Sequence, residues 1–325
     1  MPQLTMRFDL RLPHFLHCTP AEQYQAALDQ AAWADRMGFS HIMVSEHHGA
    51  EDGYLPSPLV FLSAVAARTR CVRLMQAVLL MPLHHPLRVA EDVAVLDLIS
   101  NGRVDLVLGL GYARQDFENF GVPLKGRGKY IEEGVEVLKA AWSGDWFEYQ
   151  GRRVRVTPRP VQQPRPGILL GGNSRVAARR AARIADGFVP GNPEAFAHYR
   201  EACAELGRET PQSGGGVGPA FLHIAENVEQ AWEQILPHAL HEANCYAQWE
   251  KEGGIVGLYN KPQTEDTLRE NPEYRVVTPE ECIELFRQLG PDGRAFVHPL
   301  MGGLDPQLAW SSLRLLEEKV LPAVR

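Results

Sequence analysis

The sequence predicts an α/β protein with one domain over residues 1–325, a closed parallel (β/α)8 TIM barrel. Eight strand-like segments alternate with helix-like segments along the whole chain, the order typical of a parallel barrel. A length of 325 residues suits one such barrel with an insertion. The rival fold, an open doubly wound sheet, normally has a Gly-x-Gly-x-x-Gly turn after its first strand, and the sequence lacks that turn there.

The first half of the chain supplies four strand–helix units. Apolar residues at Phe8, Leu10 and Leu12 alternate with polar ones and predict the first strand. A helix follows from about Pro20 and ends near Gly38, a residue typical of helix C-termini. The next strands are expected at 41–44, 72–81 and 104–108, and their helices at 58–67, around 89–96 and at 131–142.

The second half continues the alternation but adds two irregular segments. Turn residues between β-prone arms predict a small hairpin insertion at about 146–157. The stretch of about 250–276 lacks periodicity and contains Gly, Pro and Asn, so we expect a lid there. The remaining strands are expected at 168–170, 186–189, 217–224 and 295–297, and the remaining helices from about 175, at 195–206, 228–240, 279–289 and about 309–320.

Composition excludes several classes of protein. The chain has 33 Lys and Arg residues against 40 Asp and Glu, which argues against a nucleic-acid partner. Its five cysteines are widely spaced without a Cys-x-x-Cys pair, so reduced thiols in the cytoplasm are expected rather than disulfides or a zinc ribbon. We see neither a signal peptide nor a membrane-spanning stretch, and therefore expect no membrane partner.

The first cluster of candidate site residues is Glu46-His47-His48, directly after the second predicted strand. Active sites of parallel barrels form where strands end and the following loops begin. Two imidazoles beside a carboxylate could bind a metal, exchange protons or contact a polar ring. Adjacent strand residues point in opposite directions, so we do not expect His47 and His48 to chelate one ion together. One of the histidines could equally fill a hydrogen-bonding role in the loop.

Two further clusters follow later strands. His84 and His85 precede Pro86, where a helix should begin. A protonated histidine is disfavoured at that end of a helix, so these residues suit a loop or cap better than catalysis. Residues 171–174 read Gly-Gly-Asn-Ser at a strand-to-helix turn, where backbone amides could bind a phosphate. Ordinary turns and helix caps favour the same four residue types.

Taken together, these patches give the chain a family resemblance. In their order and spacing, the chain resembles the bacterial luciferase-like flavin oxidoreductases over nearly its whole length. The patches that carry the resemblance are Met37-Gly38-Phe39, Glu46-His47-His48, Pro82-Leu83-His84-His85-Pro86, Ala90-Glu91-Asp92, Leu96 to Arg103, Gly109-Leu110-Gly111, Gly171-Gly172-Asn173-Ser174, Ala185-Asp186-Gly187, His298 to Gly303 and Lys319-Val320-Leu321-Pro322.

The resemblance implies a flavin-dependent monooxygenase, usually a homodimer. Such enzymes take reduced FMN from a separate flavin reductase, and O2 then forms a peroxyflavin that oxidises a small organic substrate. A large branch of the family uses a deazaflavin instead, so a deazaflavin-dependent hydride-transfer enzyme is the alternative. From other classes, a metal-dependent hydrolase barrel using Glu46, His47, His84 and His85 and a non-catalytic flavin-binding protein remain open.

The resemblance also implies residue roles. His47 would lie beside the flavin as a base or hydrogen-bond donor, in a catalytic patch with Glu46 and His48, and no metal ligand is implied. Gly109 stands where luciferase has a reactive cysteine, so thiol chemistry is not expected, and Leu110 replaces one of the family's phosphate-binding arginines. Relatives often have a non-proline cis peptide in the segment matching 76–78. The implied cofactor-binding residues are Gln76, Ala77, Val78, Gly109, Arg127, Gly171, Gly172, Asn173 and Ser174.

Overall fold

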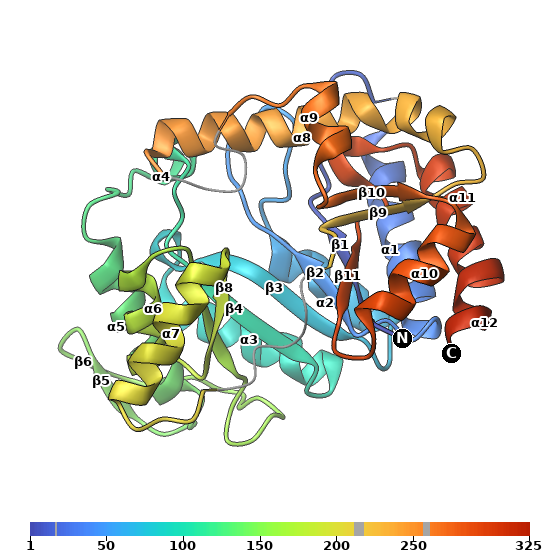
Figure 1. The fold of residues 1–325 in the computed structure, drawn as a ribbon. Coiled ribbons are helices and arrows are strands. Elements are labelled where there is room, and N and C mark those ends of the chain that lie inside the picture. The colour runs from blue at the N-terminus through green and yellow to red at the C-terminus, as the bar shows by residue number, and fades with distance from the viewer. Residues whose placement is uncertain (17, 211–217, 256–260) are drawn as a thin grey trace.

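Seven parallel strands form a curled central sheet in the computed structural model, which describes residues 1–16, 18–210, 218–255 and 261–325 (Figure 1). The strand order is β11-β1-β2-β3-β4-β7-β8. Every neighbouring pair is parallel, so the carboxyl ends of the strands meet on one side, here called the strand-end face. The strands are β1 (Gln3–Phe8), β2 (His41–Val44), β3 (Arg73–Leu80), β4 (Val104–Gly109), β7 (Ile168–Gly172), β8 (Gly187–Pro190) and β11 (Arg294–Val297).

Helices connect these strands and cover the sheet. The helices are α1 (Pro20–Arg36), α2 (Pro58–Arg68), α3 (Pro86–Ser100), α4 (Arg114–Phe120), α5 (Arg127–Ala141), α6 (Arg175–Ile184), α7 (Pro193–Glu205), α8 (Val228–Gly253), α9 (Glu265–Glu270), α10 (Pro279–Leu289), α11 (Pro306–Leu315) and α12 (Leu321–Val324), with short 3-10 helices η1 (Met81–Leu83) and η2 (Met301–Gly303) and a π-helix η3 (Leu316–Val320). Several begin at a proline because its fixed φ suits the first helical position. Among the described residues, no helix combines the length and apolar character of a membrane span.

The core lies on both faces of the sheet. Leu106, Val107 and Leu108 follow one another in β4, and all three are fully buried. Since consecutive strand residues point to opposite faces, both faces of β4 must be covered.

The strand expected at 217–224 differs from the prediction. Within the described residues, β9 (Phe221–Ile224) pairs with β10 (Tyr274–Val277) in a separate parallel ladder. The segment before β9 nevertheless lies beside β11, because the Phe296 amide donates to the Pro219 carbonyl oxygen at 3.0 Å. The backbone pairing thus gives a seven-stranded sheet with a two-stranded ladder near one edge. Closure into an eight-stranded barrel stays a prediction.

Other expectations hold or change locally. Strands β5 (Phe147–Tyr149) and β6 (Arg152–Val154) pair antiparallel within the predicted hairpin. The first strand ends at Phe8 rather than near Leu12, and Leu10 takes a positive φ of 54°. The region of about 250–276 is not one irregular segment, because it contains the end of α8, all of α9 and β10. Residues 256–260 of the expected lid lie outside the described residues.

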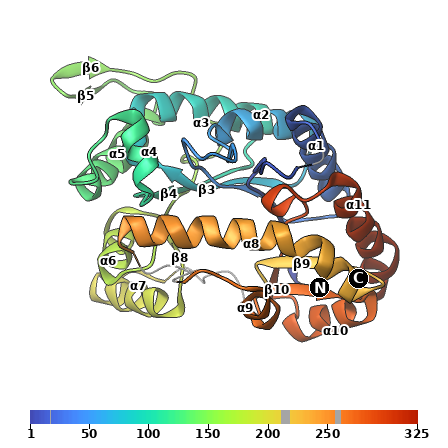
Figure 2. The same ribbon diagram turned by 90° about the horizontal axis from the view of Figure 1, so that it is seen from above.

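Helix α8 lies across the strand-end face (Figure 2). It has 26 residues, and the sequence predicted only its first half, to about residue 240. Its last turn is attached to the first residue of α4, since the Arg114 guanidinium donates to the Glu252 carbonyl oxygen at 2.7 Å. A Cβ on Gly253 would lie 2.5 Å from the Tyr112 carbonyl oxygen, so this close approach requires a glycine. The carboxyl half of α8 therefore faces the loops after β2 and β4.

Candidate active site

His47 is held by a buried carboxylate that the sequence analysis did not identify. Its Nδ1 lies 3.0 Å from Asp116 Oδ2, and the His48 backbone N–H donates to Asp116 Oδ1 at 2.7 Å. Asp116 is fully buried on α4, a seven-residue helix too short and polar to give a clear sequence pattern. A carboxylate at Nδ1 favours the tautomer with its proton there, which leaves Nε2 as the proton acceptor.

Glu46 and His48 belong to a different arrangement from His47. Glu46 Oε1 lies 2.8 Å from His48 Nε2 and 2.6 Å from His84 Nε2. Its Oε2 accepts from Gln76 Nε2 and from the Leu80 amide, each at 3.0 Å. Burial acts to raise the pKa of Glu46, but the hydrogen bonds from His48 and His84 outweigh it and lower this pKa to about 2. Glu46 is thus an ionised carboxylate that joins the ends of β2 and β3.

The four candidate ligands of the metal-dependent hydrolase alternative, Glu46, His47, His84 and His85, do not come together at one site. His47 pairs with Asp116, and the ring of His85 packs against Tyr149 with centroids 6.0 Å apart. Within the described chain, the group around Glu46 contains His48 and His84 instead. The expectation that His47 and His48 do not chelate one ion together is consistent with this arrangement, since they contact different carboxylates.

Aromatic rings surround the His47 imidazole. Ring centroids lie 4.5 Å away for Trp249, 4.9 Å for Tyr54, 5.8 Å for Tyr112 and 6.0 Å for Tyr246. These residues come from the loops after β2 and β4 and from α8. The sequence analysis did not single out Tyr54, which follows the histidine patch in an irregular loop. His47 itself is only 6% exposed, so the rings shield it from bulk water.

Arg11 lies beneath these rings as a fully buried cation. Its Nη1 lies 2.5 Å from Asp52 Oδ2, and its Nε lies 3.2 Å from Asp9 Oδ2. The guanidinium carbon lies 4.6 Å from the Tyr54 ring centroid, 5.0 Å from that of Tyr246 and 4.9 Å from that of Trp249. Arg11 therefore joins the aromatic residues of α8 to the loops after β1 and β2.

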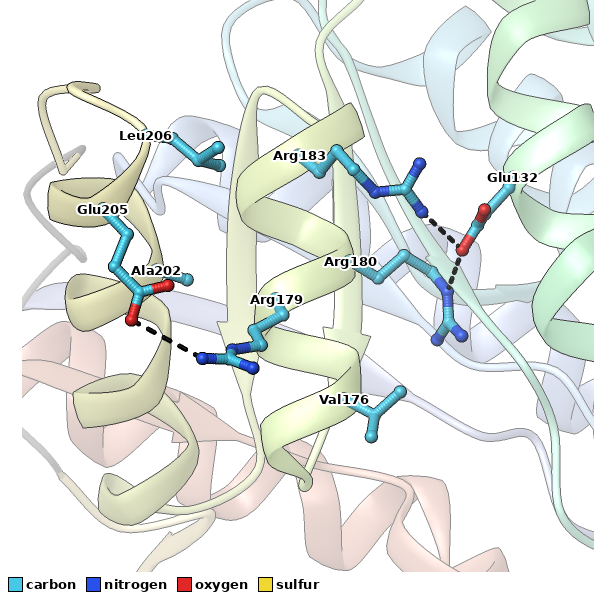
Figure 3. Close-up of a pocket in the computed structure, with 8 residues that line it drawn as sticks. All are labelled: Glu132, Val176, Arg179, Arg180, Arg183, Ala202, Glu205 and Leu206. Carbon is cyan, nitrogen blue, oxygen red and sulfur yellow. Dashed lines mark hydrogen bonds and ion pairs between the residues drawn. The ribbon is translucent and has the colours of Figure 1, made fainter.

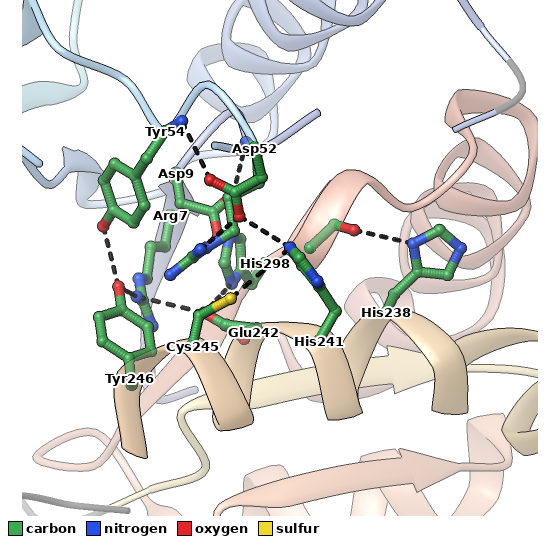
Figure 4. A network of polar contacts seen from close by, with 12 residues as sticks. Arg7, Asp9, Asp52, Tyr54, His238, His241, Glu242, Cys245, Tyr246 and His298 are labelled. Carbon is green, nitrogen blue, oxygen red and sulfur yellow. Dashed lines mark hydrogen bonds and ion pairs between the residues drawn. The ribbon is translucent and has the colours of Figure 1, made fainter. Parts of the chain in front are cut away.

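A polar network continues from Asp52 to His241 of α8 (Figure 4). Asp52 Oδ2 also lies 2.7 Å from His241 Nε2. This hydrogen bond, with a contribution from Cys245, raises the pKa of His241 to about 9.

A second, deeper group lies beside the first. His298 Nε2 lies 3.5 Å from Asp9 Oδ1, and His298 Nδ1 lies 3.7 Å from Glu242 Oε1 (Figure 4). Arg7 Nη2 approaches Glu242 Oε1 at 3.3 Å and donates to the Tyr246 hydroxyl oxygen at 3.0 Å. Because Arg7 of β1 pairs with Glu242 of α8, and His298 after β11 lies beside Glu242, α8 is anchored to the strand-end face by polar contacts as well as by rings.

The predicted flavin-ring segment lies where β3, β4 and β7 meet. The Ala77–Val78 peptide bond is cis, as the family resemblance implies. A Cβ on Gly109 would lie 2.5 Å from Val78 Cγ2, and one on Gly171 would lie 2.9 Å from Val78 Cγ1. Glycines on both sides of Val78 therefore give a wall with few side chains, and Ser45 fixes its edge by donating to the Ala77 carbonyl oxygen at 2.9 Å.

The predicted phosphate residues lie at two helix N-termini. Ser174 is the N-cap of α6, and its Oγ accepts from the Ala177 amide at 3.2 Å. Asn173 and Ser174 are exposed, so the positive end of α6 is open to an anion. Arg127 begins α5, but its Nη1 donates to the Gly111 carbonyl oxygen at 2.5 Å, and burial lowers its pKa. The structure thus places Arg127 against the loop after β4.

A cavity of about 450 Å³ lies on the outer helices, away from His47 (Figure 3). It is lined by residues of α5, α6 and α7, and its charges are mostly paired. Arg180 Nε and Arg183 Nη2 lie 3.0 and 2.7 Å from Glu132 Oε1, and Arg179 Nη2 lies 3.5 Å from Glu205 Oε1. This pairing suits a charged helix face rather than catalytic groups.

Comparison with known proteins relates this chain to flavin enzymes. A family model described as luciferase-like monooxygenase matches residues 6–290. The 4-hydroxyprotoasukamycin monooxygenase of Streptomyces nodosus subsp. asukaensis is 27% identical over 86% of this chain and 80% of its own. The crystal structure of monooxygenase RslO1 from Streptomyces bottropensis has 26% identity and a TM-score of 0.79, covering 99% of this chain and 100% of that chain.

Two more distant structures share the fold. The oxygenating constituent of 3,6-diketocamphane monooxygenase from Pseudomonas putida, in complex with FMN, has 20% identity and a TM-score of 0.70, covering 100% of this chain and 99% of its own. An F420-dependent secondary alcohol dehydrogenase has 18% identity and a TM-score of 0.71, with both chains fully covered.

Proposed function

Because the chain belongs to the luciferase-like monooxygenase family, we propose that it is a flavin-dependent monooxygenase that oxidises a small organic molecule with reduced FMN and O2. The observation that carries this proposal is the His47–Asp116 pair, enclosed by four aromatic rings at the strand-end face. A held imidazole with a free Nε2 can accept or donate one proton there. The rings and α8 exclude water, which oxygenation by a reduced flavin requires.

The residues present fit a flavin. A flat ring system needs a wall with few side chains, and Gly109 and Gly171 provide one on either side of Val78. The exposed N-terminus of α6, with Asn173 and Ser174, is suited to a terminal phosphate. When bound, reduced FMN supplies the electrons and reacts with O2. The chain's own residues bind and orient the cofactor, exclude water, and hold a proton at His47.

A deazaflavin-dependent hydride-transfer enzyme is the second candidate. The likeness to the F420-dependent alcohol dehydrogenase supports it, because that protein has the same fold with a TM-score of 0.71. The 3,6-diketocamphane monooxygenase constituent has a nearly equal TM-score of 0.70. We favour FMN because the relatives that match at 26–27% identity are monooxygenases.

The first experiment is rapid mixing of the anaerobic protein and reduced FMN with oxygenated buffer. We expect a near-ultraviolet absorption band that decays more slowly with the protein than when free reduced FMN is mixed with oxygenated buffer in the same way. His47→Ala should shorten its lifetime, and His198→Ala on α7 should leave it unchanged. Immediate formation of oxidised FMN by the wild-type protein would overturn the proposal. Titration with reduced deazaflavin, followed by fluorescence, would then decide whether the second candidate replaces it.

We further propose that the protein works as a cytoplasmic homodimer supplied by a separate flavin reductase. Exposed apolar side chains on the neighbouring helices α2 and α3 support the dimer: Val60 is 73% exposed, Val95 44%, Leu98 43% and Ile99 48%. The five cysteines are all free, which suits a reducing compartment. We also propose that β9 completes the barrel beside β11, because the bond between Phe296 and Pro219 already joins their segments.

A further inference from the structure

Glu46, His48 and His84 bring three potential metal-binding atoms together. Their ligand atoms all lie within 4.8 Å of one another. Glu46 Oε1 is shared, with His48 Nε2 at 2.8 Å and His84 Nε2 at 2.6 Å. Two imidazoles and one carboxylate form a ligand set that zinc enzymes use, with a fourth position open to water.

The surroundings hold these three residues in place. Glu46 Oε2 is occupied by Gln76 Nε2 and the Leu80 amide, which leaves Oε1 to face the imidazoles. The His48 backbone N–H donates to Asp116 at 2.7 Å. The His84 carbonyl oxygen accepts from the Tyr130 hydroxyl at 3.0 Å. Such outer contacts fix ligand orientation in metal sites and raise affinity.

The three side chains differ in their exposure to solvent. The Glu46 side chain is fully buried and that of His48 is 8% exposed, but that of His84 is 32% exposed. We therefore expect an ion to reach the cluster from the side of His84.

We propose that Glu46, His48 and His84 form a binding site for Zn²⁺ or a chemically similar divalent transition-metal ion. Ligand bonds of about 2.1 Å place tetrahedral ligand atoms roughly 3.4 Å apart. The present separations of 2.8 and 2.6 Å are hydrogen-bond distances, so the imidazoles must withdraw by less than about 1 Å. Both rings would coordinate through Nε2 as the tautomer protonated at Nδ1, so the Nε2 protons that now bond to Glu46 must first leave.

A second cluster, Asp52, His241 and Cys245, has similar spacing but a different charge environment. Arg11 Nη1 already lies 2.5 Å from the Asp52 oxygen that an ion would use. A cation there would face a buried guanidinium, which disfavours binding. In the described chain, no arginine or lysine is recorded within ion-pair distance of Glu46.

A bound metal ion would affect His47, because His47 lies between the ligands Glu46 and His48 in the sequence. Moving His48 also disturbs Asp116, which bonds to the His48 amide and to His47. We infer that the ion inhibits the enzyme. This consequence rests on the proposed function, whereas metal binding itself does not.

The test measures metal binding on the intact, cofactor-free protein. After dialysis against a chelator, the protein is titrated with Zn²⁺ by calorimetry and with Co²⁺ by visible absorption. We expect one ion per chain and a Co²⁺ spectrum typical of four-coordinate nitrogen and oxygen ligands. His84→Ala should weaken the affinity at least tenfold, whereas His85→Ala, the matched neighbour, should bind like the wild type.

Two results would overturn the site. One is the absence of stoichiometric binding to the wild-type protein, and the other is equal affinity in wild type and His84→Ala. His84 is partly exposed, so this variant keeps the test valid even if His48→Ala does not fold. If the flavin experiment failed, the Zn²⁺ and Co²⁺ titrations would still test the metal site. If Zn²⁺ bound but did not change the reaction with reduced FMN, only the inhibitory role would be overturned.

Discussion

Replacing Arg11 with methionine should destabilise the protein strongly. The side chain is fully buried, and its loss leaves the carboxylates of Asp9 and Asp52 without their guanidinium partner. Removing one member of a buried ion pair costs about 3–5 kcal/mol. His241 still lies 2.7 Å from Asp52 and offsets part of its charge, so we expect a loss near the lower end of that range. Methionine can retain contact with the rings of Tyr54 and Trp249, so we expect little additional loss of stability from poorer packing. The expected loss is thus a large share of a typical free energy of unfolding, about 5–15 kcal/mol.

The assay is urea unfolding at pH 7, followed by tryptophan fluorescence and circular dichroism. Arg11→Lys keeps the charge but loses the forked geometry, so its loss should be smaller than that of Arg11→Met. The matched control is Arg88→Met, because the Arg88 side chain is 71% exposed and its ion pair with Glu91 is solvated. That control should change stability by less than about 0.5 kcal/mol. A loss below about 1 kcal/mol for a natively folded Arg11→Met would refute the reasoning.

Three further predictions address catalysis, pH and assembly. Asp116→Asn should lower the turnover number about 10²–10⁴-fold with little change in fold, because an amide no longer favours the His47 tautomer protonated at Nδ1; nitrogen NMR of His47 reports the tautomer directly. Burial lowers the pKa of His223 from 6.5 to about 4. Between about pH 4 and 6.5, the unfolded chain therefore binds a proton at His223 that the folded chain does not. The free energy of unfolding should accordingly fall by up to about 3 kcal/mol as the pH is lowered from 6.5 toward 4. His223→Phe should remove that part of the pH dependence in urea unfolding. Ile99→Asp should convert the dimer to monomer in size-exclusion chromatography with light scattering, and a wild-type monomer would exclude the α2–α3 interface.

The sequence by itself determined features that depend on short stretches of chain. Hydrophobic periodicity located β2, β3, β4 and α3 within a few residues, since burial of one face repeats every two or about 3.6 residues. Turn chemistry located the hairpin of β5 and β6, because Gln150 and Gly151 both adopt positive φ there. The order of motifs was enough to predict the family, which the match over residues 6–290 confirms.

Only the tertiary structure decided which residues act together. His47 and Asp116 are 69 positions apart in the sequence. Arg11 near the start of the chain contacts Trp249 of α8. Periodicity describes which face of an element is buried, but it does not specify the partner on that face. The same limit explains why the sequence did not predict the pairing of β9 with β10. Hydrogen bonds and ion pairs act over a few ångströms in space, and only folding sets those distances between residues remote in sequence.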